Sequence, residues 1–346
     1  MLGALGAGTA GVLAGCLGGF ERQSAWRDPP LVENRPAAVY VPAVEEGMKM
    51  YGTTTAGPYG VALSYSYPHR FWTVSGTKRN KTPVTADDSI HLMVSIWDEA
   101  TERTIPLDSG VGIELTRDGS LVSEEVAYPM LSQQMGLHYG ANYALDGAGT
   151  YSATVTIGGL SVRRTGAFEE RFETPQTATF EFEFDTDDLY DIDIREFPDR
   201  QGSRDAVAPM EMMHPLGRVR DTESLPGTLL GTAEADAVFR AYLVDDGSRF
   251  GVDGAYLYVV AATPYNGFVL PMMGLRATLT SDGDTSLDGP LTRSIEPTIG
   301  YHYGTGVEGA VETGDLRLTV EVPPQVSRHD GYETAFFDVD TVEVGW

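Results

Sequence analysis

The sequence predicts an all-β fold made of two tandem antiparallel β-sandwiches. Apolar and polar side chains alternate with the period of two that a half-buried strand requires in residues 61–67, 150–157, 179–184 and 316–322. No stretch carries a sustained helical period with capping residues, and 40 Gly and 20 Pro supply frequent turns. Many short strands joined by turns are typical of sandwiches, and 346 residues are enough for about two domains.

An internal repeat accounts for the two sandwiches. His138-Tyr139-Gly140 recurs 164 residues later as His302-Tyr303-Gly304, and a strand-like segment follows each copy. Further matches keep the same order on both sides of this motif: 88–94 with 253–259, and 162–164 with 327–329. Because order and spacing both hold, we interpret the chain as a tandem duplication.

The N-terminus resembles a lipoprotein signal. Residues 2–15 are small and apolar, too short to cross a bilayer as a helix, and lead into Leu13-Ala14-Gly15-Cys16, which resembles a lipobox. Cys16 is the only cysteine, so it cannot form an internal disulfide; we expect it to be lipidated, with a buried thiol as the alternative. No Lys or Arg precedes Arg22, and the first residues resemble those that follow the paired arginines of a twin-arginine signal. We therefore expect the true start to lie upstream and export to use the twin-arginine route.

These features give the expected domain organisation. Residues 1–16 form the signal peptide, and 17–38, which are polar and contain several prolines, form a tether. The first sandwich covers 39–190 and an acidic, proline-containing linker covers 191–228. The second sandwich, a degenerate copy of the first, covers 229–346.

Charge excludes two classes of partner. The chain has 24 Lys plus Arg against 50 Asp plus Glu, and its formal net charge of −26 repels phosphate backbones. We therefore expect neither nucleic acid nor an anionic bilayer surface bound by a basic patch. The acid-rich, lysine-poor composition is similar to that of proteins from salt-loving archaea, where concentrated salt screens the carboxylates; an ordinary acidic protein is the alternative.

Sequence motifs predict a binding protein, not an enzyme. The chain has no G-x-S-x-G elbow, Walker loop or H-E-x-x-H helix, and one cysteine cannot supply a thiolate zinc site. His91 and Met93 lie two residues apart in a predicted strand and so share a face, and Met130 precedes His138 by eight residues. Imidazole with thioether suits copper, whereas imidazole with carboxylate suits iron or zinc.

These residues resemble the periplasmic iron-transport lipoprotein family. The matching elements are His91-Leu92-Met93, Pro129-Met130, His138-Tyr139-Gly140-Ala141-Asn142, Gly149-Thr150-Tyr151 and Arg328-His329. The resemblance covers about residues 39–157 and, more weakly, the second copy. It implies an immunoglobulin-like fold, dimerisation, binding of copper or of ferrous or ferric iron, and a role in iron uptake beside a membrane permease.

The chain departs from the family at three places. Met93 replaces the usual Glu, the loop from Met130 to His138 is one residue longer, and Arg164 stands where the last His of the first copy is expected. In the second copy, Tyr256, Glu296 and His302 take the places of His91, Met130 and His138, and His329 is kept. No single copy therefore holds the full ligand set that the resemblance implies.

We expect an intramolecular pseudo-dimer to complete one site. In this hypothesis His91, Met130 and His138 of the first copy, with Met93 beside them, meet His329 of the second copy and bind an iron or copper ion. Weaker candidates are His302, which could instead hold its loop, and Met212 with His214, which lie in a linker segment that could instead pack as an apolar lid. His69 is interpreted as a strand-edge residue without a role.

The predicted function is metal handling outside the cell. We expect a protein anchored by lipid on the extracellular face of the cytoplasmic membrane that delivers iron or copper to a permease. Two alternatives stay open: a structural or adhesive sandwich protein of the cell envelope without metal, and a copper-handling protein favoured by the methionines.

Overall fold

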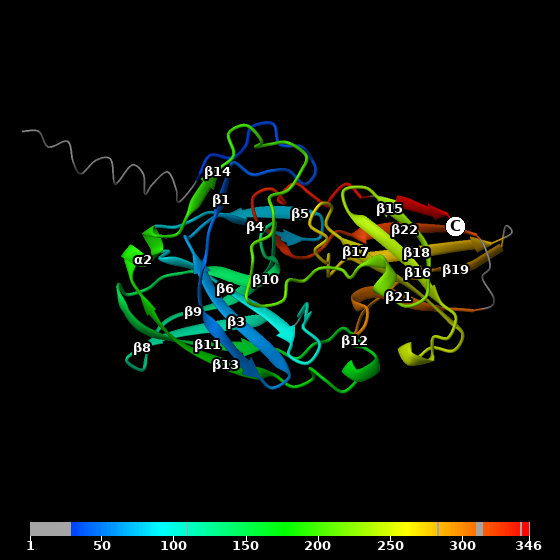
Figure 1. Ribbon diagram of the computed structural model, residues 1–346, viewed down its shortest axis with the longest axis horizontal. Coiled ribbons are helices and arrows are strands. Elements are labelled where there is room, and N and C mark those ends of the chain that lie inside the picture. The colour runs from blue at the N-terminus through cyan, green and yellow to red at the C-terminus, as the bar shows by residue number, and fades with distance from the viewer. Residues whose placement is uncertain (1–28, 109, 282–283, 309–313, 340, 346) are drawn as a thin grey trace, which may run out of the picture.

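The chain folds into two β-sandwiches that lie side by side along the long axis of the molecule (Figure 1). This is a computed structural model that describes residues 29–346 apart from 109, 282–283, 309–313, 340 and 346. It confirms the predicted all-β class with antiparallel sheets. The predicted signal peptide and Cys16 lie outside the described residues. Within the described ranges, no helix is long and apolar enough to cross a membrane.

The first sandwich is one path of strands folded into two layers. The long strand β9 (Ser120–Ser132) belongs to both layers, because its first part pairs with β8 and its last part with β10. The path closes where Tyr51 stacks on Phe182, with ring centroids 4.2 Å apart. In order, the strands are β13 (Gln176–Phe184), β11 (Gly149–Ile157), β8 (Val111–Arg117), β9, β10 (Gly136–Tyr143), β6 (Ile90–Asp98), β3 (Tyr59–Ser66) and β2 (Lys49–Ala56).

Short elements cover this sandwich. Strands β4 and β5 form a hairpin above it, and β1 pairs with β14 in a separate two-stranded sheet (Figure 1). A single α-helical turn follows β13 and is capped by the Asp185 carboxylate, which accepts from the backbone N–H of Asp187. The elements are β1 (Val44–Glu46), β4 (Phe71–Ser75), β5 (Lys78–Thr82), β7 (Arg103–Thr104), η1 (Gly166–Phe168), α2 (Thr186–Tyr190) and β14 (Ile194–Glu196).

The second sandwich repeats the strand order of the first. Strands β15, β16, β17, β21 and β20 are neighbours in the order of β2, β3, β6, β10 and β9, and β18, β22 and β24 follow the order of β8, β11 and β13. Its elements are η2 (Thr222–Ser224), β15 (Thr228–Glu234), β16 (Val238–Val244), η3 (Ser248–Phe250), β17 (Ala255–Ala262), β18 (Gly274–Ser281), β19 (Asp284–Pro290), β20 (Thr292–Glu296), β21 (Gly300–Val307), β22 (Asp315–Val322) and β24 (Thr341–Gly345).

The burial of each strand shows where apolar and polar residues alternate as the sequence predicts. In β13, Phe180, Phe182 and Phe184 are buried while the glutamates between them are exposed, which is the expected alternation. Every residue of β3 and of β6 is buried, because other segments cover the second face of these strands. The apolar core is continuous from one sandwich to the other. Such a shared core holds the two sandwiches in one arrangement.

Each sandwich also gives a short strand to the other. The strand β12 (Arg163–Arg164) pairs in parallel with β20 of the second sandwich. In return, β23 (Ser327–Arg328) pairs in parallel with β9 and antiparallel with β4 of the first. The exchange places His329, which directly follows β23, on the first sandwich.

The strand register corrects two expected equivalences between the copies. Met130 lies opposite His138, and Ser294 lies opposite His302, so the counterpart of Met130 is Ser294 and not Glu296. The two exchanged strands give the second correction. The backbone N–H of His329 donates to Leu131 O, and that of Thr165 donates to Ile295 O, the equivalent carbonyl. Thr165, not Arg164, is therefore the counterpart of His329.

Candidate metal centre

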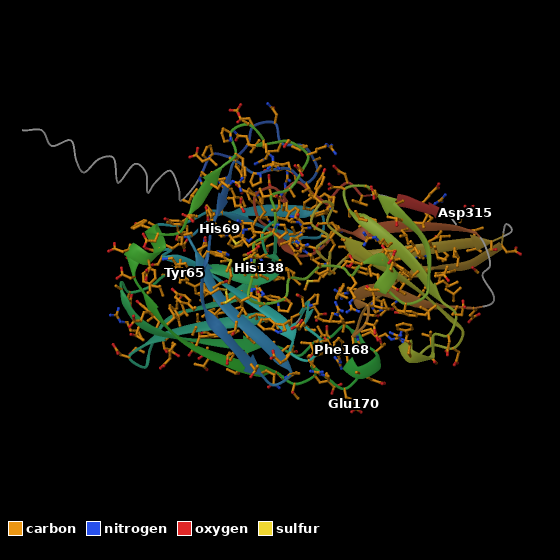
Figure 2. The ribbon with its side chains drawn as sticks, viewed as in Figure 1. Tyr65, His69, His138, Phe168, Glu170 and Asp315 are labelled. Atoms are coloured by element: carbon orange, nitrogen blue, oxygen red, sulfur yellow. The ribbon has the colours of Figure 1, made fainter. Side chains whose placement is uncertain are left out.

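Four histidines from four segments meet on one side of the first sandwich. His91 lies in β6, His138 in the neighbouring strand β10, and His69 in the connection between β3 and β4. The fourth, His329, is carried in by β23 from the second sandwich. In Figure 2, His69 and His138 lie together in the first sandwich, away from Phe168 and Glu170 at the lower junction.

Ring distances define the cluster. The ring centroid of His329 lies 5.1 Å from that of His138, 5.7 Å from that of His91 and 4.7 Å from that of His69. One ring nitrogen from each of His69, His91 and His329 lies within 4.8 Å of the other two. Metal–imidazole bonds of about 2 Å bring such nitrogens to about 3.3 Å from one another, so small side-chain rotations close the cluster around an ion.

Hydrogen bonds direct three of these rings inward. Nδ1–H of His91 donates to Asn142 Oδ1 at 2.8 Å, and Nδ1–H of His138 donates to the Gly136 carbonyl at 3.1 Å. Nδ1–H of His69 donates to Tyr67 O at 3.0 Å, with Glu46 Oε2 3.3 Å away. A histidine whose Nδ1 carries the donated proton presents a lone pair on Nε2, as metal-binding histidines do.

The second ring nitrogens are the unusual feature of the cluster. Nε2 is buried and has no hydrogen-bond partner in any of His69, His91, His138 and His329. Buried polar atoms nearly always have partners, because an unsatisfied one costs about 1–3 kcal/mol. Nitrogens of three of these rings lie within 4.8 Å of one another, and the His138 ring lies 5.1 Å from that of His329, so the cluster fits a cation that accepts their lone pairs.

The electrostatics keep the cluster ready for a cation. Burial lowers the pKa of His138 to about 4. Burial, followed by the neighbouring histidines, also lowers the pKa of His91 and that of His329 well below the usual value. These three imidazoles are therefore neutral at neutral pH, and a metal ion does not have to displace protons from them.

The predicted methionine ligands lie beside the histidines. Met93 is two residues from His91 on the same face of β6 and lines the same hollow as His138 and His329. Met130 is fully buried and is paired with both His138 and Ser327, so it lies between the strands that carry His138 and His329. Two soft sulfur atoms thus adjoin the imidazoles.

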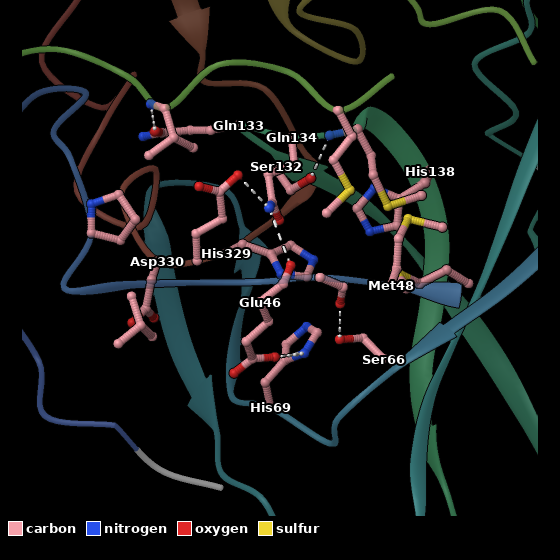
Figure 3. A pocket seen from close by; sticks show the side chains of 18 of the residues that line it. Glu46, Met48, Ser66, His69, Ser132, Gln133, Gln134, His138, His329 and Asp330 are labelled. Carbon is pink, nitrogen blue, oxygen red and sulfur yellow. Dashed lines mark hydrogen bonds and ion pairs between the residues drawn. The ribbon is translucent and has the colours of Figure 1, made fainter. Parts of the chain in front are cut away.

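A hollow connects the cluster with the surface (Figure 3). Its volume of about 90 Å³ is enough for an ion with several waters. His69, His138 and His329 lie around it, and Glu46, Met48 and Asp330 stand at its sides in the same view. An ion can reach the cluster without opening either sandwich.

One ion pair holds two of the ligand segments together. The Arg70 guanidinium donates from Nε to Asp330 Oδ1 at 3.2 Å and from Nη2 to Oδ2 at 2.6 Å, a two-point contact. Arg70 follows His69 and Asp330 follows His329, so this contact fixes the two histidines beside each other. Arg70 Nη1 also donates to Pro29 O.

The equivalent place in the second sandwich is closed by aromatic residues. Nδ1–H of His302 donates to Gly300 O, as in His138, but Nε2 accepts from the Tyr256 hydroxyl at 3.1 Å. Tyr256 stands where His91 stands, and Phe250 stacks on it with ring centroids 4.1 Å apart. In the first sandwich, the tilted ring of His69 lies 3.9 Å from that of His91. The lone pair of His302 is thus already used.

The weaker candidates in the linker lie apart from the cluster. His214 stacks on Trp97 with ring centroids 5.6 Å apart, and its Nδ1 contacts Pro215 O at 3.1 Å. Met212 and His214 line a separate, polar hollow. The structure does not bring them to the four histidines.

Sequence reasoning missed His69 and the role of Asn142. His69, interpreted from the sequence as a residue without a role, lies in the cluster, because its ring contacts both His91 and His329. No periodic pattern marks His69, since it lies in a connection after Pro68. Asn142 belongs to the motif that begins at His138. Its strand pairs antiparallel with that of His91 and places the two residues opposite each other, which could have suggested their contact.

Known proteins resemble parts of this chain. Residues 223–345 match a family described as a domain of unknown function, DUF7350. No curated protein matches the chain. Two solved structures of FetP from uropathogenic Escherichia coli strain F11 are similar to it. A copper-bound variant has a TM-score of 0.31 and 21% identity, over 40% of this chain and 97% of that one. The protein as isolated has a TM-score of 0.30 and 20% identity, over 41% and 96%.

Proposed function

We propose that this protein binds a transition-metal ion, copper or iron, in the histidine cluster and passes it to a membrane permease. The observation that carries the proposal is the set of four buried, unpartnered Nε2 atoms of His69, His91, His138 and His329. Structural zinc sites use thiolates or a closed set of four ligands, whereas this cluster adjoins an open hollow. An open hollow suits an ion that enters and leaves.

The ligand types favour copper over iron. Imidazole suits copper, iron, nickel and zinc, but a thioether is a ligand for soft ions, and Met93 and Met130 adjoin the cluster. Iron is supported by the resemblance of the His91, Met130 and His138 motifs to iron-transport lipoproteins. Both ions fit the proposed role in uptake.

We further propose that the protein is lipidated at Cys16 and works on the extracellular face of the cytoplasmic membrane. The lipobox-like sequence before Cys16 and the proline-containing tether support this placement. The charge of −26 supports a saline exterior, where it keeps the protein hydrated. A Cys16→Ser change should therefore move the protein from the membrane fraction to the soluble fraction, and an unchanged membrane fraction would contradict lipidation at Cys16.

The second sandwich has a structural part in this function. It supplies His329 through β23, and its own cluster position is filled by Tyr256 and Phe250. We propose that duplication of one sandwich replaced a dimer, leaving one metal centre and one closed remnant in each chain.

Metal binding by matched variants tests the proposal. Purified protein is titrated with Co²⁺, whose visible absorption reports imidazole coordination, and with Cu²⁺. We expect one ion per chain, lost in His138→Ala and kept in His302→Ala. Absence of binding by the natural chain, or equal binding by both variants, would reject a metal centre at these histidines and favour a structural envelope protein.

A further inference from the structure

Methionines line the hollow in front of the histidines. Four thioethers from separate segments reach it: Met48 before β2, Met93 in β6, Met135 in the turn between β9 and β10, and Met210 in the linker. Figure 3 shows sulfur atoms gathered next to the His138 ring, with Met48 at the side of the hollow. Of these four methionines, only Met93 belongs to the ligand set that was expected from the sequence.

These methionines form a path from solvent to the cluster. Met48 and Met210 are half-buried, whereas Met135 is 5% exposed and Met93 is 3% exposed. The backbone N–H of Met210 donates to Gln134 O at 3.0 Å, which holds the linker against the turn that carries Met135. Sulfur atoms are thus available at the mouth and inside.

The three carboxylates that line the same hollow each have a partner. Glu45 Oε1 accepts from Gln134 Nε2 at 2.7 Å, and Glu46 Oε2 lies 3.3 Å from His69 Nδ1. Both carboxylate oxygens of Asp330 accept from Arg70. An ion that enters therefore meets neutral thioethers more readily than free carboxylates, which selects a soft ion of low charge.

Methionines that only fill a core look different in this chain. Met272 and Met273 are buried in the second sandwich, where the backbone N–H of each donates to a tyrosine hydroxyl. Met48 and Met210 instead line a hollow that also contains His69, His138 and His329. Because they are half-buried and lie beside these histidines, their thioethers are accessible to an ion that enters the hollow.

We propose that Met48, Met135 and Met210 form an entry site for copper(I), distinct from the histidine centre. The ion binds first to the thioether sulfur atoms and then moves to the imidazoles, exchanging Cu–S bonds for Cu–N bonds. Copper stays in the +1 state and no proton is released, because neither a thioether nor an imidazole Nε2 with a free lone pair carries one. The transfer step, but not the thioether site, rests on the proposed function.

Silver(I), a soft ion without redox chemistry under these conditions, tests the site directly. The variant His138→Gln/His329→Gln should still bind one Ag⁺ per chain by native mass spectrometry, with sulfur as the nearest scatterer in X-ray absorption. Adding Met48→Leu, Met135→Leu and Met210→Leu should abolish this ion. Undiminished Ag⁺ binding after loss of the three thioethers, or nearest scatterers other than sulfur, would overturn the proposal.

A second measurement separates this proposal from the proposed function. Met48→Leu/Met210→Leu, which changes only half-buried residues, should keep full Co²⁺ binding while copper(I) transfer from a chromophoric chelator slows at least tenfold. Unchanged transfer rates contradict the entry site even if Co²⁺ binds. Conversely, absence of Co²⁺ binding with Ag⁺ retained by the thioethers refutes the histidine centre and leaves the entry site standing. Leucine for methionine nearly conserves volume, so both variants should fold.

Discussion

The imidazoles of His138 and His329 lie with their ring centroids 5.1 Å apart although 190 residues separate them in the sequence and they belong to different sandwiches. The contact depends on β23, which leaves the second sandwich and pairs with β9 of the first. Neither sandwich alone contains both rings, so the candidate metal centre exists only when the two are joined.

Substitution of either ring should weaken metal binding strongly. His138→Gln and His329→Gln each remove one lone pair, and we expect each to lower Co²⁺ affinity by more than the about 10- to 100-fold that loss of a ligand-orienting partner costs. His302→Gln is the matched control, because the Nε2 of His302 already accepts from Tyr256. Isothermal titration of the three variants checks this. Similar losses of Co²⁺ affinity in all three variants would show that metal binding does not depend specifically on the cluster.

Asn142 should act through the orientation of His91. Its Oδ1 accepts from His91 Nδ1 at 2.8 Å and its Nδ2 donates to His69 O at 3.1 Å, so it holds two ligand segments. We expect Asn142→Leu to reduce metal affinity about 10- to 100-fold with the stoichiometry unchanged. Loss of the site altogether, or no change in the dissociation constant, would be inconsistent with an orienting role.

The Arg70–Asp330 pair should couple stability to metal affinity. Arg70 is 4% exposed, so Arg70→Met leaves the Asp330 carboxylate without its main cation. Because Asp330 is partly exposed, we expect a loss of unfolding free energy near the lower end of about 3–5 kcal/mol. Metal affinity should fall in parallel. Urea unfolding of Arg70→Met, Asp330→Asn and the double variant measures the interaction energy between Arg70 and Asp330. Additive losses of unfolding free energy would argue against a stabilising pair.

Acid should destabilise the metal-free protein over a defined pH window. Burial lowers the pKa of His302 from 6.5 to about 4. The unfolded chain therefore binds a proton that the folded chain refuses, so this contribution to stability is full above about pH 6.5 and is lost as the pH falls toward 4. The full loss is on the order of 3 kcal/mol. His302→Gln should flatten the slope of unfolding free energy against pH in this window, and an unchanged slope would contradict the assignment.

The fold could be predicted from the sequence because its signals are local. Strands such as β13 alternate between buried phenylalanines and exposed glutamates, and the turn residues between strands are plain. The repeat gave the right partners for His91 and His138, since both lie in strands where spacing is regular. The alignment of the two copies failed where a loop intervenes. Glu296 was expected as the counterpart of Met130, but the strand register places Ser294 opposite His302.

The site could be predicted only in part, because its closure is non-local. His329 was expected at the cluster through a resemblance, whereas His69 carries no motif and is held there by long-range contacts such as Arg70–Asp330 and the Asn142 amide. The weaker candidates Met212 and His214 likewise depended on the path of the linker, which packs His214 against Trp97. Pairings of this kind depend on tertiary packing that no single segment encodes.

Diffraction from crystals grown with copper, measured at the copper absorption edge, would locate the ion in the protein. We expect one strong anomalous peak per chain among Nε2 of His69, His91, His138 and His329, about 2 Å from its ligands, so that both sandwiches bind the same ion. A peak bound by residues of one sandwich alone, or no peak at these histidines, would contradict it.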